Sequence, residues 1–135
     1  MKKFSVYLAG PIEHQTMHDA SKWRNQIEDG LLDSPQITVL NPMRHKYSTT
    51  HFVDGLHVFQ RDMHDVSTCD IAVVKWVEEL AMRGTSFELG TLYHRNVPLI
   101  WIGPRPTHPL IREMCRRAVR TNVEGAIDYL QWWMA

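Results

Sequence analysis

The chain has 135 residues, of which 44% are hydrophobic and 22% are charged, and its fifteen basic residues balance fifteen acidic ones. This composition is typical of a soluble globular protein, so we expect residues 1–135 to form a single domain. The balanced charge gives no argument for binding a nucleic-acid polymer or a membrane surface. Neither cysteine belongs to a Cys-x-x-Cys pair, and no apolar run resembles a signal peptide or a membrane span. These features indicate a cytoplasmic protein.

Short apolar runs alternate with helical periodicity in the first half of the chain. Residues 4–9 form an apolar run that ends at a Gly-Pro turn signal, and residues 37–40 form a second run that ends at Asn-Pro, which predicts two strands. After each strand, apolar residues recur at intervals of three or four, which predicts one face of a helix. These residues are Ala20, Trp23, Ile27 and Leu31 in the first helix and Leu56, Phe59, Met63 and Val66 in the second. Residues 43–55 are polar and irregular, which favours a loop over the edge of the sheet.

The second half of the chain continues this alternation. Residues 70–76 and 97–102 are predicted as buried strands, with a helix at 85–95 between them for which Thr85 is the expected N-cap. A helix at 110–117, a short strand at 118–121 and a final helix at 123–133 complete the prediction. Alternating helices and apolar strands favour a parallel sheet that is covered on both faces. We therefore predict an α/β fold, a three-layer α/β/α domain with about five parallel strands in flavodoxin-like order.

Two segments are expected to meet at the carboxyl edge of this sheet, where ligands bind in open α/β folds. They are residues 7–12 and residues 84–90. Gly10 and Gly84 have no side chain, so a ligand can approach the backbone there, and the N–H groups after Gly84 can bind an anion or a polar sugar oxygen. Glu88, expected in the first turn of its helix, points into the same crevice, where Tyr7 can donate a hydrogen bond to it.

A carboxylate that is held in this way can attack an anomeric carbon and form a covalent glycosyl ester, which a second acceptor then resolves. Taken alone, Glu88 is better explained as a first-turn glutamate that the helix dipole favours. Tyr7 alone is explained as a half-buried strand residue.

Together, the two segments resemble the nucleoside 2-deoxyribosyltransferase superfamily, which also contains deoxynucleoside monophosphate N-glycosidases. The family pattern ends its first strand with Tyr-x-Ala-Gly-Pro, which stands here from Tyr7 to Pro11. It places an aspartate on the second helix, matched by Asp62, and opens the third with Gly-x-x-x-Glu-x-Gly, matched from Gly84 to Gly90. Residues 123–130 resemble the last helix of the family. The resemblance therefore spans nearly the whole chain, and the order and spacing of its short motifs are fairly specific.

The resemblance implies that Glu88 attacks C1′ of a 2′-deoxynucleoside, after which a second base or water takes the sugar. Tyr7 would orient Glu88, and Asp62, or alternatively Asp65, would hydrogen-bond the base or protonate it as it leaves. Further residues are expected to contact the substrate. These are Gly10, Pro11, Arg83, Gly84, Thr85 and Ser86. The expected partners are a deoxynucleoside or deoxynucleotide and a free base, and the relatives' shared sites imply a homo-oligomer.

One short segment departs from the family pattern. Ala81, Met82 and Arg83 stand where transferases usually carry one or two aspartates that contact the base. Arg83 beside a helix N-terminus suits a phosphate or a carboxylate, or is a surface cation. The chain also resembles an uncharacterised phage and bacterial branch of the superfamily, whose substrate is open. Hydrolysis of a 5′-monophosphate and a non-catalytic nucleotide-binding module therefore remain alternatives.

The remaining motifs give weaker signals. His14 and His18 are four residues apart, but no glutamate follows His14 as it does in His-Glu-x-x-His. The pair His64-Asp65 is typical of all-helical phosphohydrolases, a fold that the predicted strands argue against. There is no P-loop or Gly-x-Gly-x-x-Gly motif, and we expect no metal ion and no cofactor. Cys69 is expected to be a buried thiol, and the apolar pair at 132–133 is expected to pack on the core or on a neighbouring subunit.

Overall fold

Five strands form one parallel sheet in the computed structural model, which describes residues 3–12, 15–44, 55–80 and 82–135. The strands are β1 (Phe4–Ala9), β2 (Ile37–Leu40), β3 (Ile71–Lys75), β4 (Leu99–Ile102) and β5 (Val119–Thr121). Their order in the sheet is β2-β1-β3-β4-β5, and all four pairings are parallel. This is the flavodoxin-like order, so the predicted α/β fold class is confirmed.

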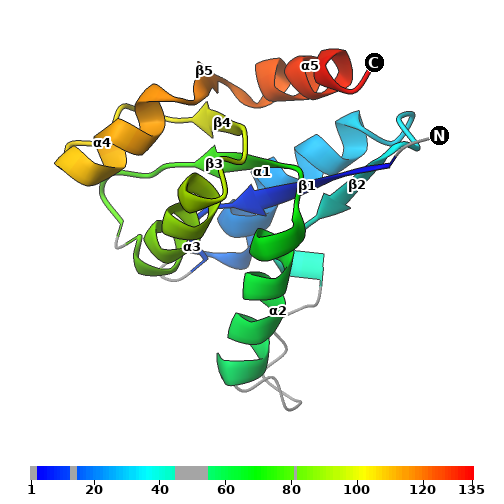
Figure 1. Cartoon of the computed structure of the whole chain (residues 1–135). Helices are drawn as coiled ribbons and strands as arrows, with labels where there is room; N and C mark the ends of the chain where they lie inside the picture. Colours follow the sequence, from blue (N-terminus) through cyan, green and yellow to red (C-terminus); the bar gives the residue numbers. More distant parts are fainter. Residues whose placement is uncertain (1–2, 13–14, 45–54, 81) are drawn as a thin grey trace.

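Five helices cover the two faces of the sheet. They are α1 (Met17–Gly30), α2 (Gly55–Thr68), α3 (Arg83–His94), α4 (Pro109–Arg116) and α5 (Val123–Trp133), and a short 3₁₀ helix, η1 (Pro42–Arg44), follows β2. Buried side chains of α1 and α5 pack on one face, and those of α2, α3 and α4 pack on the other. In Figure 1, α2 and α3 lie in front of the sheet and α1 lies behind it. Trp23, Ile27 and Leu31 of the first predicted stripe, and Val66 of the second, therefore pack in the core on the sheet.

The alternation of side chains along β1 decides which helices surround Tyr7. Val6 and Leu8 belong to the core under α1 and α5, whereas Tyr7 and Ala9 belong to the core under α2, α3 and α4. Successive side chains of a strand point to opposite faces, so this assignment follows from the pleat. Tyr7 consequently faces the helix that carries Glu88.

The carboxyl ends of β1 and β3 lie next to each other at the centre of the sheet. Ala9 is paired with Val74, so the chain leaves both strands at the same level. After β1 the chain runs through α1 to β2 on one side, and after β3 it runs through α3 to β4 on the other side. This reversal is the topological switch point, where open α/β sheets bind their ligands.

The first turn of α3 differs from the sequence-based prediction. The helix begins at Arg83, and the N-cap is Met82, whose side chain makes no capping hydrogen bond. Thr85 is therefore not the N-cap; it lies inside the helix and is only 3% exposed. Ser86 N donates to Met82 O at 2.7 Å, which closes the first turn on the carbonyl group three residues before Thr85, the predicted N-cap. Glu88 consequently lies in the second turn, and its predicted place in the first turn is wrong.

Other sequence-based predictions have mixed outcomes. The observed strand and helix bounds otherwise agree with the prediction to within two residues. Cys69 is buried and free, as expected, and burial raises the pKa of its thiol to about 11. Most of the predicted loop at 43–55, together with the side chains of Leu56 and Phe59, lies outside the described residues.

The two tryptophans near the C-terminus have different surroundings. The ring of Trp133 packs edge-on against Phe4, with 5.4 Å between ring centroids. Trp132 is 69% exposed and its ring lies 5.4 Å from that of Tyr129. The expected packing on the core therefore holds for Trp133 and not for Trp132. Within the described part of the chain, no helix has the length and apolar character that crossing a membrane requires.

Candidate active site

Three side chains from three different elements interact near the carboxyl edge of the sheet. Tyr7 comes from β1, Asp62 from α2 and Glu88 from α3. The negative charges of Glu88 and Asp62 both raise the pKa of Tyr7, after burial as the largest cause. The structure thus brings together the three residues that the sequence singled out for chemistry, although they are far apart in the chain.

The Glu88 carboxyl group is held in an environment that disfavours its charge. Burial is the main cause that raises its pKa to about 8, and the Asp62 carboxylate adds to the rise, whereas contact with Tyr7 and the charge of Arg24 oppose it. The pKa therefore lies near neutral pH, where the group can accept and release a proton. Perturbed values of this kind are typical of functional carboxyl groups.

Tyr7 and Glu88 hold polar atoms that are buried and unsatisfied. Among the described residues, neither Tyr7 Oη nor Glu88 Oε2 has a hydrogen-bond partner. The phenol is close enough to favour the charged carboxylate, but the two groups do not reach the geometry of a formed hydrogen bond. Buried polar groups are nearly always paired in folded proteins, so two adjacent exceptions are typical of a site that is completed by a ligand.

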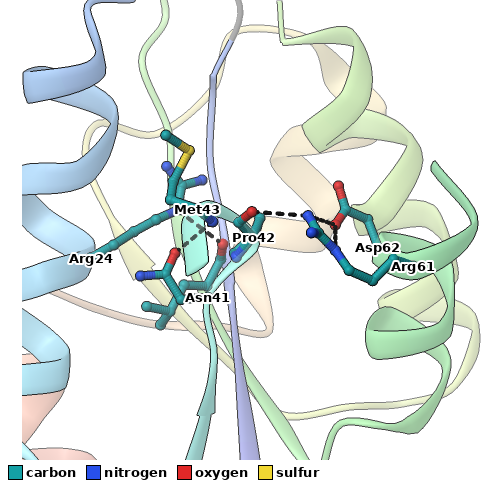
Figure 2. A network of polar contacts seen from close by, with 7 residues as sticks. Arg24, Asn41, Pro42, Met43, Arg61 and Asp62 are labelled. Atoms are coloured by element: carbon teal, nitrogen blue, oxygen red, sulfur yellow. Dashed lines mark hydrogen bonds and ion pairs between the residues drawn. The ribbon is translucent and has the colours of Figure 1, made fainter. Parts of the chain in front are cut away.

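Asp62 is oriented by the arginine next to it in the chain. Its Oδ1 accepts hydrogen bonds from Arg61 Nη2 at 3.1 Å and from Arg61 Nε at 3.4 Å, and the same Nη2 donates to Pro42 O at 2.9 Å. Arg61 therefore ties α2 to η1 while it positions Asp62 (Figure 2). Asp65, the alternative aspartate, is also buried, but Asp62 is the one whose charge acts on Glu88.

The sequence reasoning missed Arg24, which is completely buried on α1. Its guanidinium group donates to Ala20 O at 2.6 Å, to Gly10 O at 3.0 Å and to Leu8 O at 3.4 Å. Its charge lowers the pKa of Glu88. A signal was available, because position 24 stands four residues after Ala20 on the predicted apolar face, where a charged residue is unusual.

The predicted substrate-binding residues fall into two groups. A Cβ atom on Gly10 would lie 2.8 Å from Trp23 Cζ2, so the space beside this glycine is filled by α1 and is not open to a ligand. Pro11 is buried too. At the start of α3, by contrast, a Cβ atom on Gly84 would meet nothing within 4 Å, and Arg83 is exposed.

The other two predicted binding residues, Thr85 and Ser86, are buried and half-buried. The open part of the predicted binding segment is therefore Arg83 with Gly84, at the N-terminus of α3. Ala81 and His14 lie outside the described residues. Within the described ranges, no group of three or more His, Cys, Asp or Glu residues gathers where it could hold a metal ion.

Comparisons with known proteins agree with this fold. The model of a family described as nucleoside 2-deoxyribosyltransferase like matches residues 3–105. Among solved structures, a conserved protein from Enterococcus faecalis V583 has a TM-score of 0.75 at 13% identity, covering 96% of this chain and 98% of that one. No curated protein matches the chain in sequence.

Two further solved structures have the same fold. A 2-deoxyribosyltransferase from Bacillus psychrosaccharolyticus has a TM-score of 0.67 at 19% identity and covers 93% of this chain and 91% of that one. A CMP N-glycosidase from Clostridium botulinum has a TM-score of 0.61 at 17% identity and covers 96% and 98%. At these sequence identities, the three solved structures show only that the fold is shared. The family model, in contrast, matches most of the chain in sequence.

Proposed function

The chain belongs to the nucleoside 2-deoxyribosyltransferase-like family, and from this premise we propose that it is an enzyme that cleaves the N-glycosidic bond of 2′-deoxynucleosides. The reaction passes through a covalent deoxyribosyl–Glu88 intermediate and transfers the sugar to another base. The observation that carries the proposal is a buried carboxyl oxygen of Glu88 beside the hydroxyl of Tyr7, neither of which has a hydrogen-bond partner among the described residues. The Glu88 pKa of about 8 means that most Glu88 groups carry a proton at pH 7, so the carboxylate that attacks C1′ is the minor form there and becomes more abundant as pH rises.

Each residue of the site has a role in the proposed reaction. A carboxylate oxygen of Glu88 forms a bond to C1′ while the bond from C1′ to the base nitrogen breaks, and its electron pair leaves with the base. Tyr7 stays neutral, because burial raises the pKa of its phenol further above neutral pH, and it donates a hydrogen bond that orients Glu88. Asp62, whose carboxylate is held by Arg61, hydrogen-bonds the base; in molecules in which it carries a proton, it gives that proton to the base nitrogen as the bond to C1′ breaks.

The second half of the reaction regenerates the enzyme. A nitrogen of the acceptor base attacks C1′, the ester bond breaks with its electron pair returning to the Glu88 carboxylate, and the proton of the acceptor nitrogen passes to the Asp62 carboxylate or to water. Because 2′-deoxyribose has no 2′-hydroxyl, it tolerates the oxocarbenium-like charge of both transition states better than ribose does.

Hydrolysis of a deoxynucleoside 5′-monophosphate is the second candidate. It is favoured by Arg83, which is exposed in the first turn of α3 beside the open position of Gly84. No acidic residue lies in that turn. A guanidinium group next to helix N–H groups suits a phosphate. In this case water takes the place of the acceptor base.

One set of incubations tests both candidates. Each common deoxynucleoside and its 5′-monophosphate is incubated with the protein, with and without a free acceptor base, and the released base is separated by chromatography. Transfer requires the acceptor, whereas release without an acceptor indicates hydrolysis. If no substrate loses its base, the chain is a nucleotide-binding module and the proposal is wrong.

Glu88→Gln is the variant that tests the nucleophile. We expect base release to fall by about 10³-fold or more, because the amide cannot form the glycosyl ester. Intact-mass analysis of the wild-type protein during turnover should show the added mass of one deoxyribosyl group, and the variant should not. A folded Glu88→Gln protein with wild-type activity would exclude Glu88 as the nucleophile.

We also propose that the protein is cytoplasmic and forms a homo-oligomer. Two free, buried cysteines suit a reducing compartment, and the exposed indole of Trp132 is a candidate contact between subunits. Light scattering of the wild-type protein and of Trp132→Ser tests the assembly, and a monomeric wild-type protein would refute it.

A further inference from the structure

We infer that Arg24 is a positioning residue for the proposed reaction: it anchors the carboxyl end of β1 and supplies the positive charge that keeps the Glu88 carboxylate available for attack. This inference rests on the proposed function. It concerns a residue of α1, on the face of the sheet opposite to α3, and none of the sequence motifs contains it.

The anchoring part follows from the hydrogen bonds of the guanidinium group. Nη2 donates to Gly10 O at 3.0 Å and Nε donates to Leu8 O at 3.4 Å, while Nη1 returns to Ala20 O within α1 at 2.6 Å. Leu8 follows Tyr7 directly, and Gly10 follows the last residue of β1. The planar, forked side chain therefore holds the backbone on both sides of the point where the strand of Tyr7 ends.

Close packing around Gly10 means that the Arg24 hydrogen bonds require a residue without a side chain at position 10. A Cβ atom at position 10 would lie 2.8 Å from Trp23 Cζ2 and 3.3 Å from Arg24 Nη2. The guanidinium group also lies over the ring of Trp23, 4.7 Å from the centroid. The glycine of the Gly-Pro turn thus leaves room for the arginine and the tryptophan of α1 to reach the strand end.

Packing alone does not explain a charged residue at this position. Arg24 is 0% exposed, and it shares the apolar face of α1 with Ala20, Trp23 and Ile27. Burying a cation is costly unless polar groups compensate for the lost water. The three carbonyl groups accept hydrogen bonds that offset part of this cost. A positive charge held at this buried position also has a use for ionisable groups nearby.

That use is found at Glu88. The groups that act on Glu88 are Tyr7 from β1, Asp62 from α2 and Arg24 from α1. α4 also packs against α3. The cation at its C-cap, Arg117, lies over the ring of Tyr93 and is not among the groups that act on Glu88. Within the described residues, Arg24 is thus the cation that opposes burial and the Asp62 charge, both of which disfavour the Glu88 carboxylate.

The two arginines of the site have separate tasks. Figure 2 shows Arg24 and Arg61 approaching the segment from Asn41 to Met43 from opposite sides. Arg61 pairs with Asp62 and with Pro42 O. Arg24 holds the end of β1 instead. Removing the charge of Arg24 should therefore change Glu88 without releasing Asp62.

The test compares Arg24→Gln, which keeps an amide donor and loses the charge, with Arg24→Lys, which keeps the charge and loses the fork. Lys75→Gln is the matched control. It removes a half-buried cation at the end of β3 whose pKa is lowered by burial and then by Arg24, but which does not act on Glu88. The carboxyl carbon of Glu88 is titrated by NMR in free, isotope-labelled protein.

We expect the Glu88 titration midpoint to rise in Arg24→Gln, to rise less in Arg24→Lys and to stay at the wild-type value in Lys75→Gln. A rise of about half to one pH unit lowers the carboxylate fraction at pH 7, so kcat/KM for base release should fall about three- to tenfold and recover at higher pH. This recovery with pH distinguishes a charge effect from general structural damage.

An unchanged midpoint in Arg24→Gln overturns the inference, and so does an equal rise in the Lys75→Gln control. If Arg24→Gln does not fold, Arg24→Met takes its place, because it removes the charge and keeps an unbranched side chain in the core; an unchanged Glu88 midpoint in that variant also overturns the inference. The titration needs no substrate. If the wild-type protein releases no base, the proposed function is wrong, but the NMR titration still shows whether Arg24 acts on Glu88.

Discussion

Replacing Tyr7 with phenylalanine removes one oxygen atom and leaves the buried ring in place. Tyr7 is 0% exposed, and among the described residues its Oη has no hydrogen-bond partner. Burying a hydroxyl group without a partner costs about 1–3 kcal/mol. We therefore predict that Tyr7→Phe increases the free energy of unfolding by about 1 kcal/mol at pH 6, where most Glu88 carboxyl groups are protonated.

The same substitution should impair the reaction. Contact with Tyr7 favours the charged form of Glu88. The variant lacks the hydroxyl group that stabilises this carboxylate before it attacks C1′. A hydrogen bond to a charged group is worth about 1.5–3 kcal/mol, which corresponds to a fall in kcat/KM of about ten- to hundredfold. For the same reason, the gain in stability should become smaller at pH 9.

Urea unfolding of wild-type protein and Tyr7→Phe at pH 6 and pH 9 measures the stability, and chromatography of the released base measures the reaction. A variant that is less stable at pH 6 with an unchanged m-value would show that the hydroxyl is satisfied in the folded protein. A stable variant with wild-type kcat/KM at every pH would refute the orienting role of Tyr7.

Three further outcomes are expected. The raised pKa of Glu88 means that the folded protein binds its proton more tightly than the unfolded chain, so stability is lost as pH rises from about 4.5 to about 8. Glu88→Gln removes the cost of ionising this buried carboxyl group. In urea unfolding, the variant should therefore be more stable than the wild-type protein by several kcal/mol at pH 9 and about equally stable at pH 5. Gly10→Ala should cost about 1–3 kcal/mol, because its methyl group forces the Trp23 ring to move. Gly84→Ala, where a Cβ meets nothing within 4 Å, should be neutral or stabilising by about 0.5 kcal/mol in the same assay. Equal losses of unfolding free energy in Gly10→Ala and Gly84→Ala would contradict the conclusion that the space beside Gly10 is filled and the space beside Gly84 is open.

Much of the fold could be predicted because the relevant signals are local. Apolar runs of four to six residues separated by helical spacing define the strands and helices, and the parallel α/β arrangement follows from their alternation. Since parallel strands end at one edge of the sheet, the residues after β1 and β3 were also expected to lie together. Tyr7 and Glu88 lie close enough for the charge of Glu88 to act on Tyr7, although the predicted hydrogen bond between them is not formed.

The start of α3 could not be predicted from local signals. Threonine is a good N-cap and methionine is not, so the sequence favoured Thr85 over Met82. In the folded protein Thr85 is buried and Met82 takes the cap position without a side-chain hydrogen bond. Burial against the rest of the molecule outweighed the capping preference, which is worth only about 1 kcal/mol.

By itself, the sequence determined the fold class and the edge of the sheet where the segments of Tyr7 and Glu88 lie, because side-chain periodicity carries that information. Asp62 was nominated by the resemblance to the family pattern. Only the tertiary structure decided the pKa of Glu88 and which neighbouring side chains hold the site residues in place. The pKa of Glu88, the hydrogen bond from Arg61 to Pro42 O and the buried position of Arg24 all depend on distances between separate elements. Burial and charge act through space, and the linear order of residues does not contain those distances until the chain has folded.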